Sequence, residues 1–144
     1  MTFNDADRIV AEYLSQHWTA LPIAWENIEA REWSAPGQPL LPKGNKDYLS
    51  VLSDPVNSRN ITVSRTCVRR AVQYQFAVCV KQGRGTRSAR THLDSLIALF
   101  ENRTLSPGLR FSTHLGTAKY ATDNGWHVEQ SSFMAWFEAF YELS

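Results

Sequence analysis

The segment RRAVQYQFAVCVKQ, residues 69–82, decides the fold class because its apolar residues recur at every second position. Such alternation predicts a β-strand that buries one face and leaves the other partly polar. The face expected in the core carries Val72, Tyr74, Phe76, Val78 and Val80. The opposite face carries Gln73, Gln75, Ala77, Cys79 and Lys81. We therefore expect a long strand that packs on one side only.

The residues after this strand change to helical periodicity. From residue 86 onward, apolar residues recur at spacings of three and four, which predicts an amphipathic helix. A second helix is expected near the N-terminus, where Ile9, Val10, Tyr13 and Leu14 share a face and Pro22 ends the pattern. The expected core residues are Trp25, Tyr74, Phe76, Val78, Leu93, Ile97, Phe100 and Trp126.

Further strands are expected at 23–25, 48–53, 109–116 running on towards Tyr120, and 126–140. The segment 61–68 fits a short strand or the return arm of a loop. The segment 133–142 fits a strand or a helix, and the aromatic residues in 133–142 favour a strand. Residues 34–47 hold three prolines and two glycines and predict a long loop, and DPVNSRN, 54–60, predicts a flexible loop. The whole chain, 1–144, then forms a single α+β domain. Its mostly antiparallel sheet of about four to five strands packs against two main helices.

Composition excludes several classes of protein. The formal net charge of the 144 residues is +1. No apolar run is long enough to span a membrane, and the N-terminus lacks the basic and apolar pattern of a signal peptide. Cys67 and Cys79 are too few and too far apart for a disulfide framework or a CxxC site. We expect reduced cysteines in a protein made in the cytoplasm, without a membrane partner.

Motifs of catalysis are missing from the sequence. It contains no phosphate-binding loop, dinucleotide-binding glycine pattern, HExxH zinc motif or nucleophile elbow. The histidines lack metal-ligand spacing, although His114 and His127 could meet across a final hairpin as a structural or solvent-facing pair. We therefore expect no enzyme activity, catalytic residue, metal or cofactor.

Charge is distributed unevenly along the chain. Acids dominate as far as residue 32, whereas residues 65–92 contain seven basic residues and no acid. Such a split fits an acidic partner, nucleic acid or a second copy, or else the two segments neutralise each other within one chain. KQGRGTRSAR, 81–90, could bind phosphate at the helix start, although arginines there oppose the helix dipole. The candidate interface residues are Arg65, Arg69, Arg70, Arg84, Arg87, Arg90, Glu26, Glu29 and Glu32.

Three short motifs occur in a fixed order along the chain. Residues 22–27 read PIAWEN, 83–86 read GRGT before the second helix, and 123–126 read DNGW before the last strand. In this order and spacing, the sequence resembles the tail terminator proteins of long-tailed bacteriophages over nearly its whole length. Each motif is short, so their order carries the resemblance.

The resemblance implies a structural protein of the virion. Tail terminators form a ring, usually a hexamer, at the head-proximal end of the tail tube, where the ring stops tube growth and offers a surface for head joining. The implied partners are other copies of the chain, the tail tube protein and a head-completion or neck protein, with DNA only passing through the lumen. Two alternatives stay open: another head–tail connector, and a small nucleic-acid-binding module that uses the arginines of residues 65–90.

Overall fold

The computed structural model describes residues 1–25, 47–60, 67–81, 83, 86–121 and 125–140. Two helices are described, α1 (Phe3–His17) and α3 (Thr86–Phe100). The strands are β1 (Ile23–Trp25), β2 (Tyr48–Asn60), β3 (Cys67–Lys81), β4 (Thr104–Leu105), β5 (Leu109–Phe111), β6 (Gly116–Ala121) and β7 (Trp126–Phe140). The α+β class with a mostly antiparallel sheet is confirmed, and the sheet is larger than expected, with seven strands among the described residues.

One sheet joins all these strands in the order β1-β2-β3-β7-β5-β4, and β6 also pairs with β7. The long strands β3 and β7 are antiparallel and stay in register from Cys67 opposite Phe140 to Lys81 opposite Trp126. β2 is antiparallel to β3, and β1 is parallel to β2. β6 lies against the first half of β7, and β5 lies further along it.

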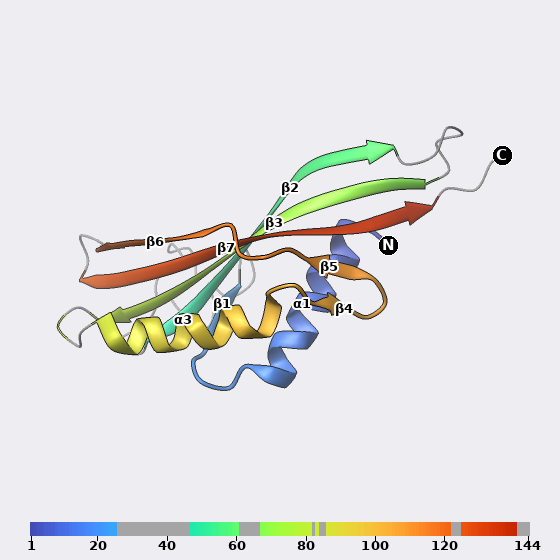
Figure 1. Cartoon of the computed structure of the whole chain (residues 1–144). Helices are drawn as coiled ribbons and strands as arrows, with labels where there is room; N and C mark the ends of the chain where they lie inside the picture. The colour runs from blue at the N-terminus through green and yellow to red at the C-terminus, as the bar shows by residue number, and fades with distance from the viewer. Residues whose placement is uncertain (26–46, 61–66, 82, 84–85, 122–124, 141–144) are drawn as a thin grey trace, which may run out of the picture.

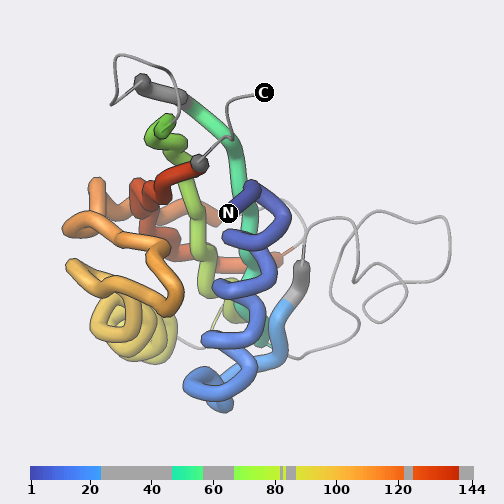
Figure 2. The backbone as a smooth tube through the Cα atoms, turned by 90° about the vertical axis from the view of Figure 1, so that its right-hand side faces the viewer, coloured from blue at the N-terminus to red at the C-terminus, as the bar shows by residue number. Residues whose placement is uncertain are grey.

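Both helices lie on the same side of the sheet (Figure 1). In the view turned by 90°, α3 is seen nearly end-on whereas α1 is seen along its length, so the two helices cross steeply (Figure 2). Thr2 caps α1 in a capping box with Asp5, which satisfies backbone donors at the first turn. Each helix has 15 residues, and neither could span a membrane.

The core between sheet and helices is built from aromatic side chains. The Phe76 ring stacks on Phe100 of α3 with a centroid distance of 4.7 Å, and it contacts Phe133 of β7 at 5.9 Å. α1 is tied to this core by two hydrogen bonds. The Tyr74 hydroxyl donates to Asp7 Oδ1 at 2.7 Å, and the Tyr13 hydroxyl donates to the Leu99 carbonyl at 2.9 Å.

The expected core residues fall into three groups. Tyr74, Phe76, Val78, Leu93 and Phe100 are buried between sheet and helices, and Ile97 packs half-buried against them. Trp126 is buried on the opposite face of the sheet, beside Cys79 and Val128. Trp25 lies on the edge strand β1, opposite Val51, and its side chain lies outside the described residues.

Two expectations about segments are wrong. The flexible loop expected at 54–60 is the second half of β2, which pairs with β3 on both sides of a register shift between Pro55 and Ser58. A register shift of this kind accommodates a proline, which has no backbone N–H to donate. The turn-forming residues therefore remain part of the strand. The strand expected from 109 towards Tyr120 is divided into β5 and β6, with residues 112–115 between them.

Other expectations agree with the structure or fall outside it. The last segment is a strand as far as Phe140, as its aromatic residues favoured. The expected loop at 34–47, except Asp47, and residues 61–66 of the segment 61–68 lie outside the described residues.

Candidate subunit interface

The sheet has a second face that no described helix covers (Figure 1). A shallow depression of about 150 Å³ lies on this face across four strands. We call its lining residues the uncovered face: Tyr48, Ser50, Leu52, Gln75, Ala77, Cys79, Tyr120, Val128 and Gln130. The residues come from β2, β3, β6 and β7 because alternate side chains of neighbouring strands point to the same side of a sheet.

The uncovered face carries no formal charge. Burial raises the pKa of the Cys79 thiol to about 11, and it also raises the pKa of the Tyr48 phenol, so both groups are neutral at physiological pH. Tyr48 packs edge-on against Trp126 with a centroid distance of 5.4 Å. A neutral surface of small, amide and aromatic side chains can pack against protein without desolvating a charge.

Apolar side chains stand at two rims of this face. Leu52 on β2 is 42% exposed and Tyr120 on β6 is 48% exposed. β3 and β7 lie between them, so the two side chains mark opposite sides of the depression. Val56 and Leu115 are the other large hydrophobic residues that are exposed within the described part of the chain. Exposed apolar groups next to a neutral face are typical of a protein interface.

Most described members of the expected basic interface have partners within the chain. Arg90 donates from Nε to Glu129 Oε1 at 3.0 Å, and Arg69 Nη2 lies 3.7 Å from Glu138 Oε1. The Arg70 guanidinium lies 5.8 Å from the centre of the Phe3 ring. Arg87 is exposed on α3. Arg65, Arg84, Glu26, Glu29 and Glu32 lie outside the described residues.

The described acids near the N-terminus do not pair with this basic segment. Asp5 contacts Arg8, and Asp7 accepts hydrogen bonds from Tyr74 and Ser53. The acids that meet Arg69 and Arg90 are Glu138 and Glu129, both on β7. Their positions on β7 depend on its register with β3, which the sequence does not reveal.

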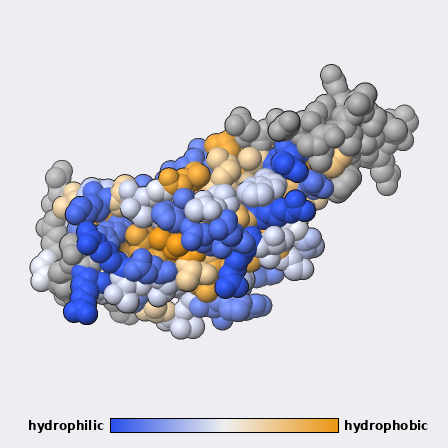
Figure 3. All heavy atoms as spheres, viewed as in Figure 1, coloured by the Kyte–Doolittle hydropathy of each residue, from blue (hydrophilic) through white to orange (hydrophobic). Residues whose placement is uncertain are grey.

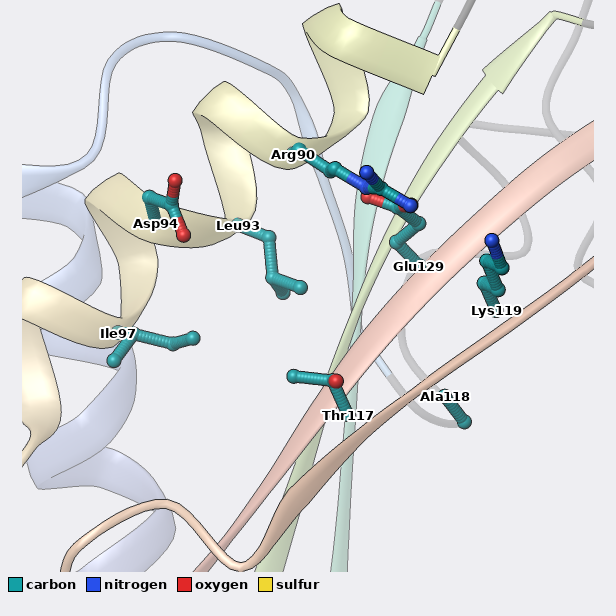
Figure 4. Close-up of a pocket in the computed structure, with 8 residues that line it drawn as sticks. All are labelled: Arg90, Leu93, Asp94, Ile97, Thr117, Ala118, Lys119 and Glu129. Atoms are coloured by element: carbon teal, nitrogen blue, oxygen red, sulfur yellow. The ribbon is translucent and has the colours of Figure 1, made fainter.

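A second concave site, the α3–β6 groove, lies on the helix side of the sheet and has a volume of about 390 Å³ (Figure 4). The space-filling view shows hydrophobic surface between α3 and the strands, bordered by hydrophilic residues (Figure 3). The groove is lined by Arg90, Leu93, Asp94 and Ile97 of α3, Thr117, Ala118 and Lys119 of β6, and Glu129 of β7. The α3 residues recur at helical spacing and form one stripe.

Within the described part of the chain, β7 carries three buried side-chain atoms without a hydrogen-bond partner, and one of them, on Glu129, belongs to the lining of this groove. The side chain of Glu129 is 4% exposed, and its Oε2 has no hydrogen-bond partner. Ser131, two residues along the same face of β7, is fully buried and its hydroxyl has no partner. His127 Nε2 lies 3.5 Å from Glu129 Oε1 and is also unsatisfied. Buried polar atoms of this kind favour a bound donor or acceptor.

The two histidines that could have met across the final hairpin, His114 and His127, lie at opposite ends of β6. His127 lies opposite Ala121 at one end of β6, and His114 precedes the other end, where Gly116 lies opposite Ser132. His114 Nε2 is 3.8 Å from Glu101 Oε2. Within the part of the chain that the structure describes, no group of three His, Cys, Asp or Glu side chains could hold a metal ion.

Comparisons with known proteins extend the description of the fold. No family model matches the chain, and no curated protein matches it. One solved protein structure that resembles the chain superimposes with a TM-score of 0.52 at 21% sequence identity. The match covers 95% of this chain and 98% of that one, and at this identity it shows a shared fold alone.

Proposed function

We propose that this chain is a tail terminator of a long-tailed bacteriophage, a non-enzymatic subunit of a ring that caps the tail tube. The uncovered face carries the proposal, because it is a neutral, partly apolar surface on a sheet whose helices lie on the other side. Packing against another protein would remove that face from water. The order of sequence motifs supplies the choice of family.

A ring requires a head-to-tail contact in which one surface of a subunit meets a different surface of the next. The uncovered face and the helix side of the sheet are two such different surfaces. The remaining ring surfaces would face the tail tube protein and the head-completion protein. Exposed basic groups, of which Arg87 is one, are available there or towards the lumen.

Tube assembly tests this proposal directly. Purified tail tube protein would be polymerised with and without this chain, and tube lengths would be measured by negative-stain imaging. A terminator binds one end of the tube and shortens the length distribution as its concentration rises. Unchanged tube lengths together with no density at tube ends would overturn the proposal. If the chain binds only to tube ends that another protein has already capped, and tube length does not change, the alternative of another neck protein is favoured.

The nucleic-acid-binding alternative makes a different prediction. Arg69 and Arg90 are engaged by glutamates of the same chain, which lowers the number of basic groups available to phosphates. A terminator should bind a short duplex weakly and without sequence preference, because DNA slides through its lumen. Tight, sequence-selective binding that falls steeply with salt would instead support a nucleic-acid-binding module.

A further inference from the structure

The strand β6 lies at an edge of the sheet (Figure 1). Within the described part of the chain it pairs with β7 on one side and with no strand on the other. All six of its residues are exposed. Gln75 and Ala77 of the uncovered face are half-buried by comparison, and their strand, β3, is flanked by β2 and β7. The exposure of every β6 residue therefore indicates that its outer edge is open.

An open edge offers unpaired backbone N–H and C=O groups to another strand. Proteins commonly protect such edges by shortening the strand or by placing proline or lysine in it. Two other strands at the margins of this sheet are short, since β1 has three residues and β4 has two. β6 has six residues and no proline, and Lys119 is its one charged residue. It keeps the features that favour addition of a strand from another chain.

The side chains of β6 alternate between the two sides of the sheet. Tyr120 belongs to the uncovered face, and Ala118 points away from α3, whereas Thr117 and Lys119 lie on the helix side (Figure 4). When two identical antiparallel strands pair about a two-fold axis, residues directly opposite each other must point to the same side. The axis must then pass at the level of one residue. Only a centre at Ala118 or at Lys119 pairs five residues of each β6.

Charge decides between these two registers. A centre at Lys119 places this lysine directly opposite Lys119 of the second copy, and like charges in that position are destabilising. A centre at Ala118 places Lys119 opposite Thr117 of the second copy instead. The charge then has a neutral neighbour, so the register centred on Ala118 is favoured.

The same register also places large side chains opposite small ones. Tyr120, which is 48% exposed, lies opposite Gly116 of the second copy, where an aromatic ring can cover an edge glycine. Leu115 precedes β6 and is 56% exposed, and it lies opposite Ala121 of the second copy. Both exposed apolar groups of this edge would lose contact with water. The edge is therefore complementary to a second copy of itself.

We propose that β6 pairs with β6 of a second copy, antiparallel and centred on Ala118, so that two sheets join into one. The uncovered faces of the two copies then lie side by side. The contact is two-fold and differs from the head-to-tail contact within a ring. It pairs free chains, or one ring with another, and it goes beyond the proposed function without depending on it.

Disulfide trapping with one variant tests this contact. In the proposed register Ala118 lies opposite itself, where Cα atoms are about 4.5–5.5 Å apart, a distance that a disulfide can bridge. Ala118→Cys protein would be oxidised mildly, with wild type and Ala98→Cys as controls. Ala98 is exposed on α3, away from the edge, and the native cysteines are buried. Each variant is first compared with wild type in thermal unfolding. We expect a cross-linked dimer from Ala118→Cys and little or none from the controls.

A charge variant gives a second measure. Ala118→Lys places two lysines opposite each other at the axis and should weaken dimerisation roughly fivefold at low salt, with a smaller effect at high salt. Ala98→Lys adds the same charge on α3 and should leave dimerisation unchanged. Sedimentation over a range of concentrations measures both, and equal effects of the two variants would contradict the contact.

The outcomes separate this inference from the proposed function. If Ala118→Cys links no better than Ala98→Cys, or less than Lys119→Cys links to itself, the contact is wrong, whether or not the chain caps tail tubes. If Ala118→Cys links efficiently but the wild-type chain neither forms rings nor shortens tubes, the strand pairing stands and the terminator proposal fails.

Discussion

Arg90 of α3 and Glu129 of β7 form a salt bridge with 3.0 Å between Nε and Oε1, although Glu129 is almost completely buried. The arginine side chain remains 57% exposed, so one end of the pair is in water and the other is in the protein. The sequence indicated a free basic residue at the start of a helix. In the folded chain, Arg90 supplies a charged hydrogen-bond donor to a buried carboxylate.

Replacing Arg90 should therefore lower the stability of the fold as well as change the charge of the surface. Arg90→Ala leaves the Glu129 carboxylate without its donor and should lower the free energy of unfolding by about 1–3 kcal/mol. Arg87→Ala, at an exposed position of the same helix, should change it by less than about 0.5 kcal/mol. Urea denaturation measures both. Equal effects for the two variants would show that the pair contributes nothing to stability.

The double variant Arg90→Ala/Glu129→Gln separates charge from packing. It removes the buried negative charge together with its partner, so it should be more stable than Arg90→Ala alone. A double variant that is less stable by the sum of the two single effects would contradict this explanation.

Phe76 tests the aromatic core. Its ring is fully buried and stacks on Phe100, so Phe76→Ala creates a cavity between β3 and α3 and should cost about 3–5 kcal/mol in chemical denaturation. Gln75→Ala, one residue away on the uncovered face, is the matched control and should cost far less. A loss below about 1 kcal/mol for Phe76→Ala would mean that the faces of β3 are reversed.

The hydrogen bond from Tyr74 to Asp7 attaches α1 to the sheet. Tyr74→Phe keeps the buried ring and removes only the hydroxyl, which donates to Asp7 Oδ1 at 2.7 Å. Because the acceptor is a carboxylate, the loss should be about 1.5–3 kcal/mol. Tyr13→Phe, which removes a bond to a neutral carbonyl, should cost less. Hydrogen exchange of the α1 amides would show whether this helix loosens first, and unchanged protection would contradict the anchoring role.

Stability should decrease at alkaline pH. Burial raises the pKa of the Cys79 thiol from 9.0 to about 11, and it raises the pKa values of the Tyr74 and Tyr48 phenols as well. The folded state then retains protons that the unfolded state releases, so the free energy of unfolding falls as pH rises above 9. For each group the slope is at most about 1.4 kcal/mol per pH unit.

Denaturation curves at pH 7, 9 and 10.5 test this dependence. Cys79→Ala should remove the share of the decrease that Cys79 contributes between pH 9 and 11, whereas Cys67, whose thiol pKa is also raised by burial, keeps its own share. The tyrosine share, which begins near pH 10, should remain. A free energy of unfolding that stays constant from pH 7 to 10.5 would contradict the burial of these groups.

The long strand and the second helix could be predicted because their patterns are local. Alternation over residues 69–82 and helical spacing from residue 86 each reflect one face that must be buried. The prediction of a loop at 54–60 was wrong for the opposite reason. Pro55 favours a turn locally, whereas pairing with β3 keeps the segment extended. Tertiary pairing outweighs turn propensity there.

The side on which Trp126 lies could not be predicted from the sequence. Tyr74 lies opposite Phe133, so even-numbered residues of β3 and odd-numbered residues of β7 share the face under the helices. Trp126, opposite Lys81, is therefore on the other face, and Glu129 is turned towards Arg90. A shift of one residue in this register would exchange these positions, and periodicity within one strand does not specify it. The α3–β6 groove depends on the same register.

The most direct test of the central claim is the mass of the wild-type protein in solution. The mass is measured over a range of concentrations, and the largest species is imaged in negative stain. We predict a closed ring of subunits with a central hole, formed by the protein alone at high concentration or on the end of a tail tube. A protein that stays monomeric at millimolar concentration and also fails to bind tube ends would contradict it.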